Sequence, residues 1–117
     1  MVEFKNLSGK RVQYGAYKKL YKKIFRKGKK GFELSVVFAP PSLMRKLNKE
    51  CRGKDKTANV LSFALEKDSG EIFLNAGEKN LPYLFLHGSL HLLGYDHKKN
   101  KDAEKMENLE KKILNKK

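Results

Sequence analysis

Residues 81–95, L-P-Y-L-F-L-H-G-S-L-H-L-L-G-Y, form the longest apolar stretch of the chain. The stretch predicts a helix from about Leu81 to Leu93, because Pro82 suits a first helical turn and Gly94 suits the left-handed residue that follows a helix. It is too short, and with two histidines too polar, to cross a bilayer. The sequence therefore predicts a histidine-bearing helix of a folded domain rather than a membrane span.

The segments before this helix predict four short strands. Runs of apolar and β-branched residues bounded by glycine, proline or polar turns are typical of buried strands. The turn K-D-S-G at residues 67–70 joins the last two strands so directly that we expect an antiparallel hairpin. The predicted strands are Val2–Leu7, Phe32–Ala39, Val60–Leu65 and Glu71–Asn75.

Three more segments predict helices. Residues Gly9–Lys27 carry apolar side chains every three or four positions and lysines on the opposite face, which is typical of an amphipathic helix. A second helix is expected from Ser42, as its N-cap, to Cys51, and a last one from Asp102. The inward residues expected are Leu43, Met44 and Leu47 in the second helix, and Met106, Leu109, Ile113 and Leu114 in the last.

Together these elements predict a single α+β domain over residues 1–117. A chain of 117 residues leaves no room for a second domain of ordinary size. Hydrophobic residues make up 39% of the chain, which is enough for a folded core and argues against disorder throughout.

The sequence also favours a cytoplasmic protein. Cys51 is the only cysteine, so we expect no internal disulfide framework, no disulfide-linked partner and a reducing compartment. Residues Met1–Val12 carry four charged side chains and no apolar segment, unlike a signal peptide. We therefore expect no membrane association.

The charge of the chain points to a polyanionic partner. It has 27 Lys+Arg and 13 Asp+Glu, for a formal net charge of +14. So high a charge on a small domain repels itself, and binding of a polyanion relieves that repulsion. Nucleic acid is the commonest candidate. A solvated, lysine-rich surface without a partner is the alternative.

All three histidines of the chain, His87, His91 and His97, lie within eleven residues. His87 and His91 are four residues apart, so they project from one face of the expected helix, and the turn at Gly94 allows His97 to return to the same point. Three neutral imidazoles can hold a tetrahedral zinc ion whose open fourth position activates a water. The pattern predicts one zinc ion per chain, although nickel, iron and manganese also accept imidazole ligands.

The same histidine spacing occurs in the metzincin proteases, with one decisive difference. Those proteases carry their general base, a glutamate, directly after the first histidine, and Gly88 stands there in this chain. A protease of this type would lose most of its capacity for proton transfer. Asp96, beside His97, is the nearest carboxylate in the sequence. We expect it to orient a histidine through a hydrogen bond or to act as a capping residue, with a general-base role as the alternative.

Residues 52–59, R-G-K-D-K-T-A-N, form a second informative segment. Arg52, Lys54 and Lys56 place three cations within five residues, just before a predicted strand. A loop of this type can hold phosphates through its charge and its backbone N–H groups. Beside a metal centre, an arginine that clamps a phosphate suits the hydrolysis of a phosphodiester.

Several separated motifs together resemble the YbeY family of bacterial metal-dependent endoribonucleases. The decisive one is H-G-S-L-H-L-L-G-Y-D-H at residues 87–97. The others are L-N at 47–48, R-G-K-D at 52–55, N-V-L-S-F at 59–63, G-E-I at 70–72, A-E-K-M-E at 103–107 and I-L at 113–114. The resemblance covers roughly the C-terminal two-thirds of the chain, with the motifs in the family's order.

The resemblance implies both a fold and a function. The implied fold is a small mixed sheet covered by helices, with the three-histidine helix beside it. The implied activity is that of a zinc-dependent, single-strand-specific endoribonuclease, with zinc on His87, His91 and His97. Arg52 would be the family's functional arginine, tied to RNA binding or cleavage.

The resemblance also implies a cellular role and partners. The role is maturation of the 3′ end of small-subunit (16S) ribosomal RNA, together with ribosome quality control. The partners are ribosomal RNA and the small ribosomal subunit. Lys54, Lys56 and the basic face of the first helix are expected to hold the RNA backbone.

The chain departs from the family pattern in three places. It is shorter than most members, and the loss falls between Asn75 and Leu81, which is expected to leave the site more open. Ala58 stands where the family usually has threonine. Glu71 stands where it usually has aspartate, in a strand expected to face the site.

Two other functions stay open on the sequence alone. A metzincin-like metalloprotease is supported by the histidine spacing and opposed by Gly88 and by the excess of cations. A non-enzymatic ribosome-binding factor, in which the metal only holds His97 to the helix, also fits, because the sequence identifies no general base.

Overall fold

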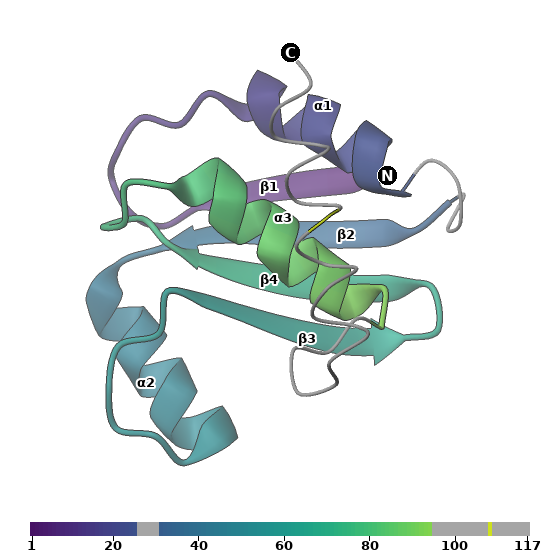
Figure 1. The fold of residues 1–117 in the computed structure, drawn as a ribbon. Coiled ribbons are helices and arrows are strands. Elements are labelled where there is room, and N and C mark those ends of the chain that lie inside the picture. Colours follow the sequence, from purple (N-terminus) through teal and green to yellow (C-terminus); the bar gives the residue numbers. More distant parts are fainter. Residues whose placement is uncertain (26–30, 95–107, 109–117) are drawn as a thin grey trace.

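A four-stranded mixed sheet forms the centre of the structure, a computed structural model that describes residues 1–25, 31–94 and 108. β1 (Val2–Asn6), β2 (Glu33–Ala39) and β4 (Ser69–Asn75) run parallel, and β3 (Val60–Glu66) pairs with β4 in the antiparallel sense. The strand order is β1-β2-β4-β3, so β3 forms one edge of the sheet (Figure 1).

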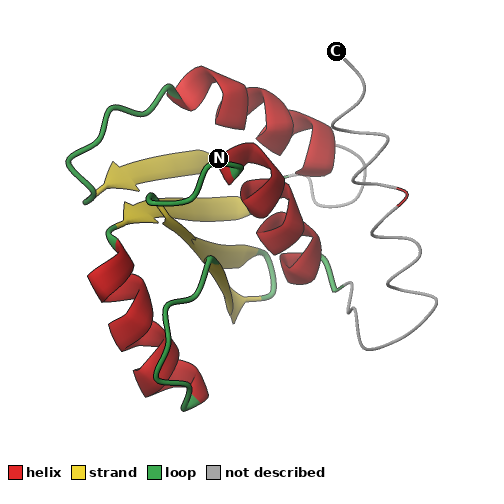
Figure 2. Cartoon of the chain, turned by 60° about the vertical axis from the view of Figure 1, so that its left-hand side comes forward, coloured by secondary structure: helices red, strands yellow, loops and turns green. Residues whose placement is uncertain are grey.

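Helices cover both faces of this sheet. α1 (Tyr14–Phe25) and α3 (Leu81–Leu92) lie side by side on one face, and α2 (Pro41–Arg52) lies against part of the other (Figures 1 and 2). The alternation of strand side chains fits this arrangement, because Ile72 joins the core under α1 and α3 whereas Phe73 packs beside Met44 of α2. The mixed α+β fold implied by the resemblance is confirmed.

The larger of the two cores lies between the sheet and the layer of α1 and α3. Tyr17 of α1 meets the ring of Phe38 on β2 at 5.1 Å between centroids and the ring of Phe85 on α3 at 5.5 Å, both edge to face. Such aromatic pairs stabilise a core beyond the burial of their area. One side chain therefore links both helices to the second strand.

α3 approaches the sheet closely because residue 88 has no side chain. A Cβ atom at Gly88 would lie 2.8 Å from Ser62 Oγ, 3.0 Å from Val60 Cγ2 and 3.3 Å from Ile72 Cγ2. The Ser62 hydroxyl donates a hydrogen bond of 3.0 Å to the carbonyl oxygen of Gly88. Helix and edge strand are thus joined at the residue that follows the first histidine of the helix.

Most predicted elements are confirmed to within two residues. The four strands, α2 and α3 all lie close to their expected bounds, and the predicted antiparallel hairpin is the β3–β4 pair. Gly94 adopts the positive φ expected after the end of α3, at +99°. No helix among the described residues is long and apolar enough to cross a membrane. The helix predicted from Asp102 lies outside the described residues.

One predicted helix start and one predicted N-cap are wrong. α1 begins at Tyr14 rather than at Gly9, because Gly9 has a φ of +76° and the Asn6 side chain accepts hydrogen bonds from the backbone and hydroxyl of Ser8. Local side-chain bonds of this kind compete with helix formation.

The wrong N-cap is that of α2. It begins at Pro41, with Pro40 as the N-cap, and no side chain caps it, so the expected cap at Ser42 is not formed. Proline suits the first helical position because its φ is already helical and its missing N–H is not needed there.

The close approach at Gly88 makes a direct prediction about stability. Gly88→Ala should lower the free energy of unfolding by about 1–3 kcal/mol, since the added methyl group overpacks the helix–sheet contact and outweighs the higher helix propensity of alanine. The measurement is urea unfolding followed by circular dichroism.

Gly15→Ala is the matched control. Gly15 also lies in a helix, but a Cβ there would meet nothing within 4 Å. Its substitution should be neutral or stabilising by up to about 1 kcal/mol. Equal midpoints for the two variants would contradict the packing argument.

Candidate functional site

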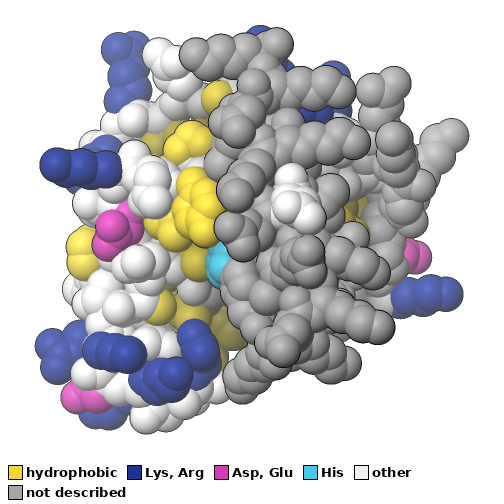
Figure 3. All heavy atoms as spheres, viewed as in Figure 1, with side chains coloured by type: hydrophobic (Ala, Val, Ile, Leu, Met, Phe, Trp, Pro, Cys, Tyr) yellow, Lys and Arg dark blue, Asp and Glu magenta, His cyan; other side chains and the backbone are white. Residues whose placement is uncertain are grey.

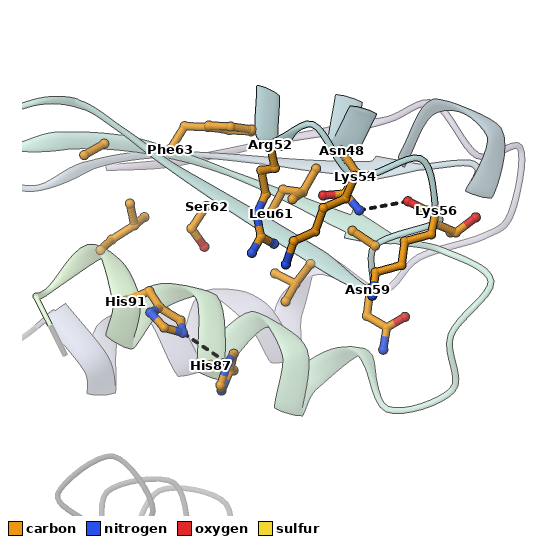
Figure 4. A pocket seen from close by; sticks show the side chains of 15 residues that line it. Asn48, Arg52, Lys54, Lys56, Asn59, Leu61, Ser62, Phe63, His87 and His91 are labelled. Carbon is orange, nitrogen blue, oxygen red and sulfur yellow. Dashed lines mark hydrogen bonds between the residues drawn. The ribbon is translucent and has the colours of Figure 1, made fainter. Parts of the chain in front are cut away.

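An open groove of about 780 Å³ runs along the outer edge of β3. α3 forms one wall, and the C-terminal end of α2 with the loop that follows it forms the other (Figure 4). Its lining comprises Asn48, Arg52, Lys54, Lys56, Thr57, Ala58, Asn59, Val60, Leu61, Ser62, Phe63, Ala64, His87, His91 and Leu92. A volume of this size is typical of ligand-binding clefts.

The α3 wall carries two converging histidines. The Nε2 atoms of His87 and His91 lie 3.2 Å apart, as the dashed line between them in Figure 4 marks. Two nitrogen ligands of a tetrahedral zinc ion, each about 2.0–2.1 Å from it, are separated by about 3.3 Å. The spacing of the two rings therefore fits two ligands of one ion.

The third expected ligand, His97, and its neighbour Asp96 lie outside the described residues. Within residues 1–25, 31–94 and 108, no group of three or more possible metal ligands occurs. The structure thus supplies two adjacent imidazoles on α3, one turn apart, whose geometry suits the predicted metal centre.

The opposite wall of the groove is cationic. Arg52 ends α2, and Gly53 turns the chain with a φ of +68°, a left-handed conformation that glycine adopts without strain. The side chains of Arg52 and Lys54 extend toward α3, where the histidines lie (Figure 4). The structure therefore brings together five of the sequence-predicted site residues, His87 and His91 with Arg52, Lys54 and Lys56.

Hydrogen bonds fasten the cationic loop to α2. The buried Asn48 side chain donates from Nδ2 to the carbonyl oxygen of Lys56 at 2.8 Å, and the Lys54 N–H donates to the carbonyl oxygen of Asn48 at 3.3 Å. Arg45 bonds Asp55 at 3.0 Å, and this hydrogen bond, with the attraction of the carboxylate, raises the pKa of Arg45. Hydrogen bonds to backbone groups of the loop thus hold it against α2, and Arg45 pairs with the negative charge of Asp55.

The groove is positively charged. None of its described lining residues is an aspartate or glutamate. Figure 3 shows Lys and Arg side chains gathered over α2 and its following loop, at the lower left. Glu71, expected in a strand facing the site, does not line the groove; its carboxylate accepts a hydrogen bond of 3.4 Å from Ser35. The arrangement attracts an anion to the histidine pair.

The short connection between β4 and α3 does not itself line the groove, but Asn75 at its start bonds a residue that does. Asn75 closes that connection, since its Oδ1 accepts from the Gly77 N–H at 2.9 Å and its Nδ2 donates to the carbonyl oxygen of Ala58 at 3.3 Å. No residue from 75 to 81 lines the groove, whereas Ala58 does.

Two polar residues that hold the site together were among those not predicted from the sequence. Ser62 lines the groove and bonds α3, and Asn48 is buried beneath the cationic loop. Both are polar residues at positions where the apolar pattern predicts an inward side chain, one in the strand V-L-S-F-A-L and one a turn after Met44. A polar side chain on an inward face is almost always hydrogen-bonded, so the pattern of the sequence could have indicated both residues.

Comparisons with known proteins show which family the chain is similar to. The family model described as Endoribonuclease YbeY matches residues 3–117. Relatives named Endoribonuclease YbeY are 37% identical over 105 residues in Rhizobium etli (70% of this chain, 61% of the relative) and 37% over 109 residues in Spiroplasma citri (71% and 69%). A third, from Staphylococcus saprophyticus, is 36% identical over 108 residues (71% and 71%). The chain thus spans between 61% and 71% of the length of these relatives.

A solved structure has the same architecture. The solution structure of TM1509 from Thermotoga maritima superposes with a TM-score of 0.67 at 23% sequence identity, covering 98% of this chain and 90% of that one. At that identity the likeness concerns the fold alone. The family match over nearly the whole chain, and the identities above 30% to curated relatives, lead to one conclusion: the chain belongs to the Endoribonuclease YbeY family.

Proposed function

We propose that this protein is a zinc-dependent, single-strand-specific endoribonuclease that matures the 3′ end of small-subunit (16S) ribosomal RNA and serves ribosome quality control. The observation that carries the proposal is that two converging histidines face a cationic wall across one groove. Membership of the YbeY family supports it.

Each residue has a distinct task in this proposal. His87, His91 and His97 hold the metal, one ion per chain, and Asp96 orients one of them. When bound, zinc supplies an activated water near neutral pH and polarises the phosphate. Arg52 is the catalytic arginine, which donates hydrogen bonds to the phosphate and stabilises the negative charge that develops on it.

The RNA backbone is held on the cationic wall. Lys54 and Lys56, which line the groove, contact phosphates of the RNA backbone, so binding depends strongly on salt. The lysines on the outer face of α1 lie across the sheet from this wall, and they bind the part of the RNA backbone that lies outside the groove. Ribosomal RNA of the small subunit, in the cytoplasm, is the proposed partner.

The packing of Gly88 favours a nuclease over a protease. A glutamate at this position is the general base of the metzincin proteases. Here a Cβ at Gly88 would already press on Ser62 and Val60, so position 88 has no room for a longer side chain. The groove accordingly takes its charged groups from α2 and its loop, which suit a phosphodiester.

Loss of one histidine tests the metal centre. His91→Ala should lower zinc affinity in equilibrium dialysis, and metal-dependent cleavage of single-stranded ribosomal RNA, each by at least about 100-fold, because an ion with two remaining imidazoles is poorly held. The fold should survive, since His91 is exposed. Equal cleavage by variant and parent would point to a contaminating nuclease, and cleavage of casein in place of RNA would favour a metalloprotease.

Salt dependence tests the cationic wall. Lys54→Ala should reduce the slope of log Kd against log salt for a single-stranded RNA by about 0.7, the effect of one lost phosphate contact. Lys46→Ala is the matched control, because Lys46 is an exposed lysine of α2 that does not line the groove. An equal change in both variants would show that the charge acts from a distance rather than by contact.

The cellular role is tested in cells depleted of the protein. The 3′ ends of small-subunit ribosomal RNA, mapped by sequencing, should carry unprocessed extensions that disappear when the parent gene is restored and persist with His91→Ala. Normal ends in depleted cells would contradict a role in maturation. Tight ribosome binding without any turnover would instead support a non-enzymatic factor.

A further inference from the structure

The strand that lines the groove is an edge strand. β3 pairs only with β4 among the described strands, and its other side faces the groove. Consecutive residues from Val60 to Ala64 line the cavity, so the groove follows the strand itself rather than a single side chain. An open edge presents a row of backbone N–H and C=O groups.

The register identifies which of these groups face the groove. The Asn75 N–H donates to the carbonyl oxygen of Asn59 at 2.9 Å, which makes Asn59 and Asn75 a hydrogen-bonded pair of the antiparallel ladder. In such a ladder the backbone groups of successive residues alternate between the partner strand and the open side. Leu61 and Phe63 therefore bond β4.

The backbone groups of Val60, Ser62 and Ala64 consequently point outward. The neighbouring chain supports the same alternation, since the Ala76 N–H, one residue after Asn75, donates away from β3 to the carbonyl oxygen of Ala39, the last residue of β2. The groove thus contains donors and acceptors spaced two residues apart along a straight strand, about 6.8 Å from one to the next.

We propose, building on the nuclease function above, that these outward backbone groups bind the base edges of an unpaired nucleic-acid strand laid along β3. The phosphates of that strand face Arg52, Lys54 and Lys56, and its bases face Val60, Ser62 and Ala64. Base edges are free for such hydrogen bonds only when they are not already paired. The edge of β3 is therefore the element that selects single strands over duplexes.

The chemistry of the groove favours this occupant over a peptide. An extended peptide would also satisfy an open strand edge by adding a strand to the sheet. A peptide backbone carries no charge, however, whereas the wall beside β3 presents three cations and no described carboxylate. Phe63, which is partly exposed, adds an aromatic ring to the lining, and a base can stack on such a ring.

The test removes one outward N–H without removing a charge. Ala64 is exposed, its N–H points away from β4, and the ladder becomes irregular just after it, so proline is tolerated there. Ala64→Pro should weaken binding of a fluorescein-labelled, unstructured 12-mer RNA by about 5- to 10-fold, the loss of one hydrogen bond. Fluorescence anisotropy with metal chelated measures binding without cleavage.

Three comparisons make the result specific. Ala64→Gly, which keeps the N–H, should bind like the parent. The salt slope of Ala64→Pro should equal that of the parent, because no phosphate contact is lost, unlike Lys54→Ala. The same 12-mer annealed to its complement should bind parent and Ala64→Pro equally, since its base edges are already paired. If Ala64→Pro fails to fold, an ester in place of the Ser62 amide removes the neighbouring outward N–H.

Several outcomes would overturn the inference. Parent-like binding of the single strand by Ala64→Pro would do so, as would an equal loss for single strand and duplex. If Ala64→Pro lost binding to an extended oligoglutamate peptide but kept its RNA binding, the groove would be assigned to a peptide. The two proposals can fail separately. If the parent never cleaved RNA but Ala64→Pro still weakened RNA binding, the nuclease function would be overturned and the base-edge site would be supported.

Discussion

The contact between α3 and the edge of the sheet at Gly88 is the constraint on which the groove depends. Because residue 88 adds no atom beyond its backbone, the helix lies close enough for the Ser62 hydroxyl to bond the Gly88 carbonyl oxygen. That contact fixes both the distance and the rotation of α3 relative to β3. The two histidines on either side of this turn therefore face the groove and not the core.

The two walls of the groove belong to opposite faces of the sheet. α3 lies on the face that carries the larger core, and α2 lies on the other, so their functional side chains can meet only beyond the last strand. This explains why the site lies on an edge. It also explains why the loop after α2 needs fastening through Asn48, since none of the described strands lies beyond β3 to support it.

The local features of the chain could be predicted from its sequence because local rules decide them. Turn residues and apolar periodicity predict the strands, α2 and α3. The four-residue spacing of His87 and His91 places both side chains on one face of a helix. The start of α1 was wrong because the Asn6 side chain offers the backbone a local alternative to a helix. The cap of α2 was wrong because Pro41 favours the first helical position more strongly than Ser42 favours the cap.

The long-range features could not be predicted in the same way. Nothing in V-L-S-F-A-L distinguishes an edge strand from a central one, because strand order is decided by pairings between distant segments. Arg52 and the histidine pair face the same groove because of that strand order and because the chain turns at Gly53. The expectations for His97 and Asp96 rest on the sequence, since both lie outside the described residues.

An exposed strand edge also invites self-association. Two copies of the chain that paired through β3 would extend their sheets into one, and this pairing is how open edges begin to aggregate. Arg52, Lys54 and Lys56 line that edge, so a second copy would bring an equal set of cations against the first. Repulsion between the two positive walls therefore opposes pairing through β3 when no polyanion is present.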